Sequence, residues 1–179
     1  MLQSTVILAF ASIAAAAAAT WKDVKCLSDA EASQIASRYI ALYDTGAVSQ
    51  LSDLTSIVTQ NFTSYDGTGT GPYDNGPSTV GAQAFYESLT ASTGPSSFTD
   101  SVQSPVFVIH TCDTVVYRWQ FTAVSTGYNA TVPAGTKLAF EGTDIVQVDL
   151  SSKLIYNATS SGDWINLARE LGQIGNYFP

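Results

Sequence analysis

Residues 140–150 read Phe-Glu-Gly-Thr-Asp-Ile-Val-Gln-Val-Asp-Leu, and apolar and polar side chains largely alternate along them. Successive side chains of a β-strand point to opposite faces, so this alternation predicts a strand with one buried face. Asp144 shares the phase of Phe140, Val146 and Val148, and we therefore expect it to point into the interior. A buried carboxylate costs free energy unless it is paired or neutralised. Asp144 is thus the first candidate for a functional group.

The rest of the chain predicts helices first and strands afterwards. Ser28 and Glu31 form a capping-box pattern before a helix that Gly46 would end, and Ser78 would cap a later helix that ends before Gly94. A short helix is expected over residues 48–58. Strands are expected at residues 62–65, 106–111, 114–125, 137–150 and 153–159. This order indicates an α+β fold with helices on one concave face of a curved sheet.

The first stretch of the chain has the character of a targeting segment. Residues 2–19 are apolar and uncharged, and small residues before Thr20 provide cleavage positions. We interpret residues 1–19 as a secretory signal peptide and residues 20–179 as one domain, so the protein is expected to be secreted. A membrane anchor of barely sufficient length is the alternative interpretation.

Two further features agree with export. Cys26 and Cys112 are the only cysteines, and in an oxidising compartment they are expected to form a disulfide rather than remain buried thiols. Sequons for N-glycosylation begin at Asn61, Asn129 and Asn157. We therefore expect a glycoprotein, although such tripeptides also arise by chance.

The charge balance argues against several classes of partner. The chain carries 7 basic and 15 acidic residues and a net charge of −8, which disfavours nucleic acid. A single histidine and the lack of a Cys or Asp cluster argue against a metal centre. The glycines after Asp66 lack the lysine of a phosphate-binding loop, so no cofactor is expected.

The order of elements, together with residues 38–46 (RYIALYDTG) and 142–149 (GTDIVQVD), resembles the nuclear-transport-factor-2-like superfamily, also called SnoaL-like. The resemblance covers residues 28–172. It implies a cone-shaped, strongly curved, mostly antiparallel sheet with three N-terminal helices that close an apolar pocket. Such pockets serve isomerases, dehydratases, hydrolases, polyketide cyclases and pure binding proteins, so the fold does not choose an activity.

Within this superfamily, the polar positions are most similar to those of ketosteroid isomerase. Tyr39 matches its oxyanion tyrosine, Asp66 falls where its general base lies, and Asp144 matches its protonated oxyanion acid. Tyr86 belongs to a matching Phe-Tyr pair. The resemblance implies that Asp66 removes a carbon-bound proton while Tyr39 and Asp144 stabilise the enolate oxygen.

Each candidate also has a structural interpretation. Tyr39 could be a core tyrosine, Asp66 a turn former, and Asp144 a buried carboxylate bonded to the first helix. The aromatic phase of residues 117–123 would line the pocket through Tyr117, Trp119 and Phe121, or simply form core. His110 precedes a turn, which favours a place at the rim or surface; a proton carrier like those of the related dehydratases is the alternative interpretation.

Two functions follow from these alternatives. The first is a secreted, cofactor-free isomerase, dehydratase or cyclase that acts on an apolar oxygenated metabolite through Tyr39, Asp66 and Asp144. The second is a secreted binding protein of the same fold, which holds a small hydrophobic molecule or forms a homodimer through its outer sheet face.

Overall fold

The computed structural model describes residues 25–66, 76–91 and 94–174. The expected signal peptide, residues 1–19, and residues 67–75 of the glycine-rich loop lie outside the described residues. Within the described part, none of the helices has the length and hydropathy needed to span a bilayer.

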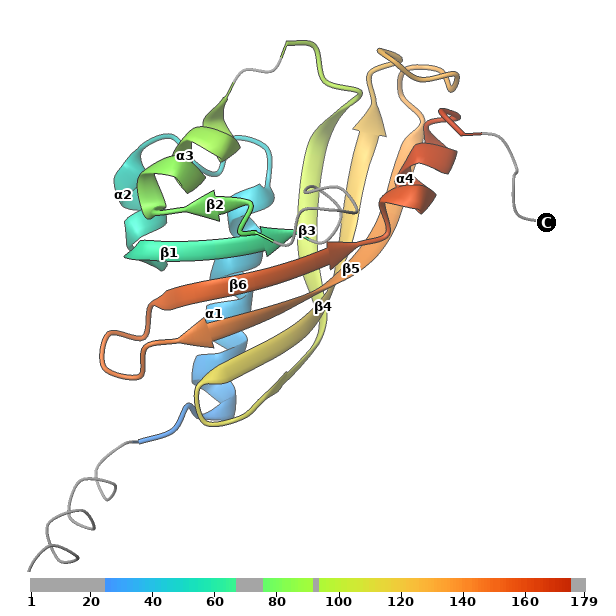
Figure 1. The fold of residues 1–179 in the computed structure, drawn as a ribbon. Helices are drawn as coiled ribbons and strands as arrows, with labels where there is room; N and C mark the ends of the chain where they lie inside the picture. Colours follow the sequence, from blue (N-terminus) through green and yellow to red (C-terminus); the bar gives the residue numbers. More distant parts are fainter. Residues whose placement is uncertain (1–24, 67–75, 92–93, 175–179) are drawn as a thin grey trace, which may run out of the picture.

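The fold is α+β, as the order of sequence patterns predicts (Figure 1). The helices, with one 3₁₀ turn, are α1 (Asp29–Ile40), η1 (Ala41–Tyr43), α2 (Leu51–Thr55), α3 (Ala82–Thr90) and α4 (Trp164–Glu170). The strands are β1 (Val58–Asp66), β2 (Thr79–Val80), β3 (Phe98–His110), β4 (Thr114–Ser125), β5 (Lys137–Val148) and β6 (Ile155–Gly162).

The strands form one curved sheet in the order β2-β1-β6-β5-β4-β3. All neighbouring strands are antiparallel except β1 and β6, which run parallel. The long strands bend along their length, and α1 lies behind β6 and β5 in Figure 1. Helix α1 therefore covers the inner face of the sheet, and the opposite face is the outer one.

The core lies between α1 and the inner sheet face. Strand β4 alternates as its sequence predicts: Tyr117, Trp119 and Phe121 are buried, whereas Arg118 and Gln120 are exposed. Helix α1 contributes a buried stripe at helical spacing, formed by Ala32, Ile35, Ala36, Tyr39 and Ile40.

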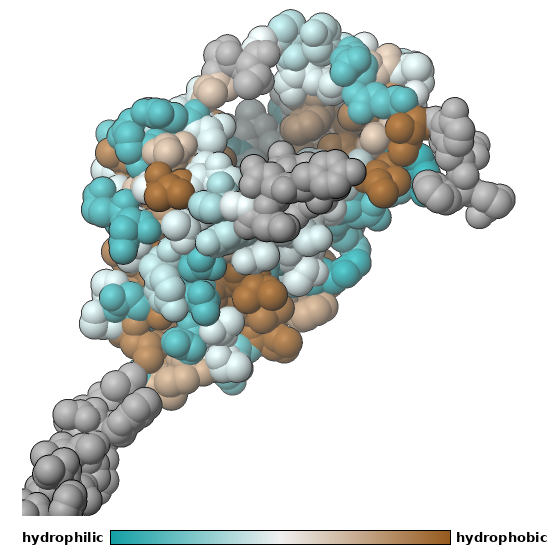
Figure 2. Space-filling model, viewed as in Figure 1, coloured by the Kyte–Doolittle hydropathy of each residue, from teal (hydrophilic) through white to brown (hydrophobic). Residues whose placement is uncertain are grey.

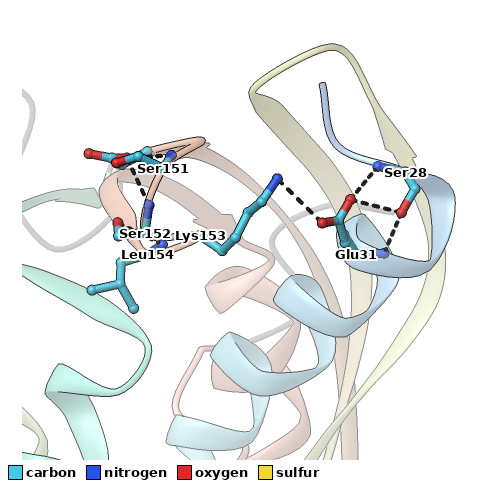
Figure 3. Close-up of polar contacts among 7 residues, drawn as sticks. Ser28, Glu31, Ser151, Ser152, Lys153 and Leu154 are labelled. Carbon is cyan, nitrogen blue, oxygen red and sulfur yellow. Dashed lines mark hydrogen bonds and ion pairs between the residues drawn. The ribbon is translucent and has the colours of Figure 1, made fainter. Parts of the chain in front are cut away.

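Helix α1 is fixed at its N-terminus by several independent contacts. The predicted capping box forms between Ser28 and Glu31, and Glu31 also pairs with Lys153 of the β5–β6 turn at 3.3 Å (Figure 3). The pKa of Glu31 is lowered from its ordinary value to about 2, chiefly because the backbone N–H of Ser28 donates a hydrogen bond to its carboxylate. The disulfide between Cys26 and Cys112 joins the segment before α1 to the β3–β4 turn.

The β5–β6 turn is built around one carboxylate. Asp149 accepts hydrogen bonds from the backbone N–H groups of Ser151 and Ser152 at 2.7 and 3.1 Å. Lys153 then takes a positive φ of 61°, a conformation that is uncommon outside glycine. These contacts define where β5 ends and β6 begins.

The structure corrects several predicted boundaries. Ser78 does not cap α3: its hydroxyl donates to the Ser64 carbonyl at 2.9 Å, and α3 begins at Ala82 after Gly81. The helix expected over 48–58 is limited to α2, because residues from Val58 onward join β1. Strand β3 begins at Phe98 rather than at residue 106, and its ladder shifts register around Pro105. Such a shift accommodates a residue that lacks a backbone donor.

Helix α4 was not expected from the sequence, and it satisfies backbone groups that β6 leaves unpaired. The β5–β6 ladder stops at Gly142, so residues 137–141 extend beyond it. Glu170 accepts from the Ala139 N–H at 2.6 Å, and the Asn166 amide donates to the Ala139 carbonyl at 3.3 Å. Side chains of α4 thus take the place of a neighbouring strand.

Candidate functional site

A row of four side chains crosses the inner face of the sheet at one level. The register pairs Asp66 of β1 with Ser160 of β6, Ser160 with Asp144 of β5, and Asp144 with Tyr117 of β4. Directly paired residues share a face, so Ser160 stands between the two carboxylates. Since neighbouring strands lie about 4.8 Å apart, the Cα atoms of Asp66 and Asp144 are separated by roughly 10 Å.

Asp144 is buried and hydrogen-bonded through both carboxylate oxygens. Only 2% of the residue is exposed. The Trp119 indole N–H donates to Oδ1 at 2.9 Å and the Tyr117 hydroxyl donates to Oδ2 at 3.0 Å, while the Ser160 hydroxyl is a further partner. Burial raises the pKa of Asp144, and these three donors oppose the rise because they stabilise the ionised form.

Two glycines set the position of the Trp119 indole. Trp119 pairs with Gly142, and Gly142 pairs with Gly162. A Cβ atom at Gly142 would clash with the six-membered part of the Trp119 ring, and a Cβ at Gly162 would lie 3.2 Å from the same ring. The missing side chains therefore provide the space in which the indole reaches Asp144.

A cavity of about 290 Å³ opens in front of this row. Its aromatic and aliphatic walls come from Tyr43, Tyr65, Phe85, Leu89, Trp119 and Trp164. Its polar lining comes from Ser64, Asp66, Ser78, Thr79, Ser88, Gln103, Asp144 and Ser160. A mostly apolar cavity with a few convergent polar groups is typical of small-molecule sites.

Tyr43, rather than Tyr39, is the cavity-lining tyrosine of the first helical segment. Tyr39 is fully buried behind it, and the two hydroxyl oxygens lie 3.3 Å apart. Burial raises the pKa of both tyrosines, and the charges of Asp144 and Asp66 act in the same direction. Both hydroxyls therefore remain protonated at neutral pH and can donate hydrogen bonds.

Among the predicted site residues, Asp66, Asp144 and Trp119 meet at the cavity. Tyr117 lies beneath the cavity lining, where it supports Asp144, and burial raises its pKa. Phe121 packs in the core against Phe98 and Phe140.

Tyr86 does not line the cavity; its hydroxyl donates to the Ser49 carbonyl at 3.2 Å. His110 lies apart from the cavity and bonds Asp29 at 2.8 Å, which raises the pKa of the imidazole.

The three sequon asparagines lie on strands and a loop. Asn61 is exposed on β1, and Asn129 is exposed in the β4–β5 loop with a φ of 46°. Asn157 is half-buried on β6, and its amide donates to the Thr63 hydroxyl at 3.0 Å. Thr63 is the third residue of the Asn61 sequon, so two sequons adjoin on the outer face of β1 and β6.

Most of the cavity lining was missed in the sequence, and Tyr43, Ser160 and Trp164 are the informative cases. Tyr43 follows Tyr39 by four positions on one helical face, which is a signal that both point the same way. Ser160 lies one residue beyond the expected end of its strand. Trp164 belongs to α4, a helix that no sequence pattern predicts. Within the described residues, no three His, Cys, Asp or Glu side chains gather as metal ligands.

Comparison with solved structures supports the fold. A candidate polyketide cyclase from Acidithiobacillus ferrooxidans has a TM-score of 0.62 and 16% identity, over 83% of this chain and 100% of that one. A candidate SnoaL-like polyketide cyclase from Shewanella putrefaciens has a TM-score of 0.60 and 14% identity, over 80% and 98%. PrhC from Penicillium brasilianum has a TM-score of 0.58 and 12% identity, over 80% and 89%.

No curated protein is significantly similar to the chain in sequence. Residues 25–174, however, match the sequence family described as the NTF2-like domain. The match includes the whole described fold, from the segment before α1 to the residues after α4. The chain therefore belongs to the NTF2-like family, in agreement with the resemblance of its sequence to the nuclear-transport-factor-2-like superfamily.

Proposed function

We propose that the protein is a cofactor-free acid–base enzyme, which isomerises, dehydrates or cyclises an apolar oxygenated metabolite bound in the cavity. The observation that carries this proposal is the position of Asp144, a buried carboxylate that lines an aromatic cavity. We also propose that the sheet is cone-shaped and that α1, α2 and α3 close its pocket.

Asp144 is the proposed base. Its two oxygens already accept hydrogen bonds from Trp119 and Tyr117, an arrangement that suits the ionised form. Burial raises its pKa, which makes the carboxylate a stronger proton acceptor than one in water. Asp144 takes a carbon-bound proton from the ligand and returns it to a second carbon during isomerisation, or to a departing hydroxyl during dehydration.

Tyr43 is the proposed donor to the developing enolate oxygen. It lines the cavity, and its hydroxyl is within 3.3 Å of that of Tyr39. A neutral hydroxyl that faces a developing oxyanion stabilises the transition state more than the ground state. Tyr39 acts through Tyr43, since Tyr39 itself is fully buried.

Asp66 is the second candidate base. The resemblance to ketosteroid isomerase implies this role for Asp66 and the donor role for Asp144. Asp66 lines the same cavity at the other end of the four-residue row. If Asp144 is the base, Asp144→Asn should be inactive, and if Asp66 is the base, Asp66→Asn should be inactive.

Hydrogen–deuterium exchange separates the two assignments. The protein is incubated in deuterated water with an enolisable ketone such as 2-tetralone, and deuterium uptake is followed by mass spectrometry. The Asp144→Asn variant is expected to lose at least a hundredfold in enzyme-dependent uptake, as for removal of a general base, while Asp66→Asn is expected to retain it. The reverse pattern would assign the base to Asp66. The Asp113→Asn variant removes an exposed carboxylate at the β3–β4 turn and serves as the control. Equal uptake in wild type and Asp144→Asn contradicts the proposed base.

A second candidate function is binding without turnover. It is favoured by the three protein donors that already surround Asp144, which is the arrangement of a structural carboxylate. A protein that binds ketones of this size but catalyses no exchange would be a secreted binding protein.

We propose further that the mature protein is a secreted glycoprotein that forms a homodimer through its outer sheet face. The disulfide supports export. Phe107, Ile109 and Ile145 are exposed on the outer phase of β3 and β5, and Figure 2 shows a hydrophobic area on the lower part of the face it views. Analytical ultracentrifugation of wild type and Ile145→Lys tests this: a wild-type monomer contradicts the dimer.

A further inference from the structure

The charged groups that line the cavity are of one sign. Asp66 and Asp144 both contribute to the lining, and none of its described residues is Lys, Arg or His. Asp144 lies in an apolar environment where charge interactions are weakly screened. A ligand with a carboxylate or phosphate group would meet repulsion there and no fixed positive charge.

Four basic side chains of the described residues are engaged away from the cavity. Arg38 donates to the Ser56 carbonyl, and Arg118, Lys153 and His110 pair with Glu141, Glu31 and Asp29. Arg118 and Glu141 lie on the outer phase of β4 and β5, and the other pairs hold α1 to its neighbours. These cations are therefore not available to neutralise the cavity.

Five aromatic rings also line the cavity, from Tyr43, Tyr65, Phe85, Trp119 and Trp164. The face of an aromatic ring carries partial negative charge and attracts an organic cation, most strongly for tryptophan. The rings and the carboxylates thus favour the same kind of ligand group. Neutral apolar ligands would use the rings alone.

We propose that the ligand of this cavity carries an organic cation, a protonated amine or a quaternary ammonium group, attached to a flat apolar body. This inference rests on the proposed small-molecule site and specifies the class of its substrate. It also suits the proposed chemistry. A positive charge near the reacting carbon stabilises the carbanion or enolate that forms when Asp144 removes a proton, and the described lining supplies no such charge itself.

A pair of probes of nearly equal shape tests the charge requirement. Phenyltrimethylammonium is a permanent cation, and tert-butylbenzene is its neutral counterpart. Binding is followed through the indole N–H signals of Trp119 and Trp164 in ¹⁵N-labelled protein, which report on the cavity directly. The cation is expected to bind roughly tenfold more tightly or better, from cation–π attraction and the carboxylates.

Variants identify the source of the preference. Asp144→Asn and Asp66→Asn are each expected to reduce the affinity for phenyltrimethylammonium while the affinity for tert-butylbenzene is retained. Asp113→Asn makes the same change of net charge outside the cavity and is expected to leave both affinities unchanged. Retained dispersion of the amide signals shows that each variant is folded.

The outcomes are distinguishable. Equal affinity for the two probes, or a cation preference that survives both cavity substitutions, overturns the inference but leaves the cavity as a ligand site. If neither probe perturbs the indole signals, both the cation inference and the proposed binding site fail. Loss of deuterium exchange is measured separately, so failure of the catalytic proposal does not affect this result.

Discussion

Replacing Trp119 by Phe tests the account of how Asp144 is held. The substitution keeps an aromatic ring over Gly142 but removes the indole N–H that donates to Oδ1 at 2.9 Å. A hydrogen bond to a charged group contributes about 1.5–3 kcal/mol. Because this bond favours the ionised form, its loss should raise the pKa of Asp144 further.

The effect on stability depends on pH, and its sign follows from the direction of the shift. Burial already raises the pKa of Asp144 above its value in the unfolded chain. A carboxyl group with a raised pKa contributes most to the stability of the folded state at pH values below its pKa in the unfolded chain. This contribution is lost as the pH rises through its pKa in the folded state. Trp119→Phe should therefore cost about 1.5–3 kcal/mol at pH 7. The cost should be clearly less near pH 3, which lies below the unfolded pKa of about 3.9 and therefore below the raised pKa of the folded state.

Urea unfolding of wild type and Trp119→Phe at both pH values gives this difference, and NMR of ¹³C-labelled aspartate reports the pKa of Asp144. Trp164→Phe is the matched control, because Trp164 lines the same cavity but is not among the donors to Asp144. A cost that is equal at both pH values, or an unchanged pKa of Asp144, would refute the reasoning.

Three other predictions concern the support of the site. Gly142→Ala should destabilise the fold by about 1–3 kcal/mol through overpacking against Trp119, measurable by calorimetry; an unchanged melting temperature contradicts the proposed clash. Cys26→Ser should cost roughly 4–5 kcal/mol in urea unfolding, because the bridge closes a separation of 86 residues; a cost below about 1 kcal/mol would show that the chain-entropy account fails. Asp29→Asn should lower the raised pKa of His110, followed through its ring protons. In wild type, the ion pair stabilises the fold at pH values below the unfolded pKa of histidine, and this stabilisation is lost as pH rises through the folded pKa of His110. Asp29→Asn should remove it. Identical His110 titrations in wild type and variant would contradict the ion pair.

The strands with strict alternation were predictable because burial on one face leaves a direct mark on the sequence. Asp144 and the aromatic phase of β4 were placed on the inner face for this reason, and the structure confirms both placements. The capping box of α1 and the pairing of Cys26 with Cys112 were likewise visible in local or compositional patterns. The catalytic roles of Tyr39, Asp66 and Asp144 stay predictions.

Features that depend on long-range pairing were not predictable. Tyr43 and Tyr39 lie on one helical face, and only the packed structure shows which hydroxyl reaches the cavity. Ser78 has the local character of a helix cap, but pairing of β2 with β1 places it against Ser64 instead. Helix α4 is short, and its position depends on the unpaired backbone of β5, which no pattern within residues 164–170 records.

The turn that Asp149 and Lys153 build between β5 and β6 carries a consequence for how the chain tolerates change. Surface turns are usually the places where insertions and deletions do least harm. If the strands accommodated one residue inserted into or deleted from this turn, the register of β6 against β5 would shift by one residue. The side chains that follow would then point to the opposite face of the sheet. Ser160 would then leave Asp144 and turn toward solvent, and Asp66 would lose its place in the row. Substitutions in the cavity can be tolerated one at a time, but the length of this turn is expected to stay constant wherever the carboxylate row is retained.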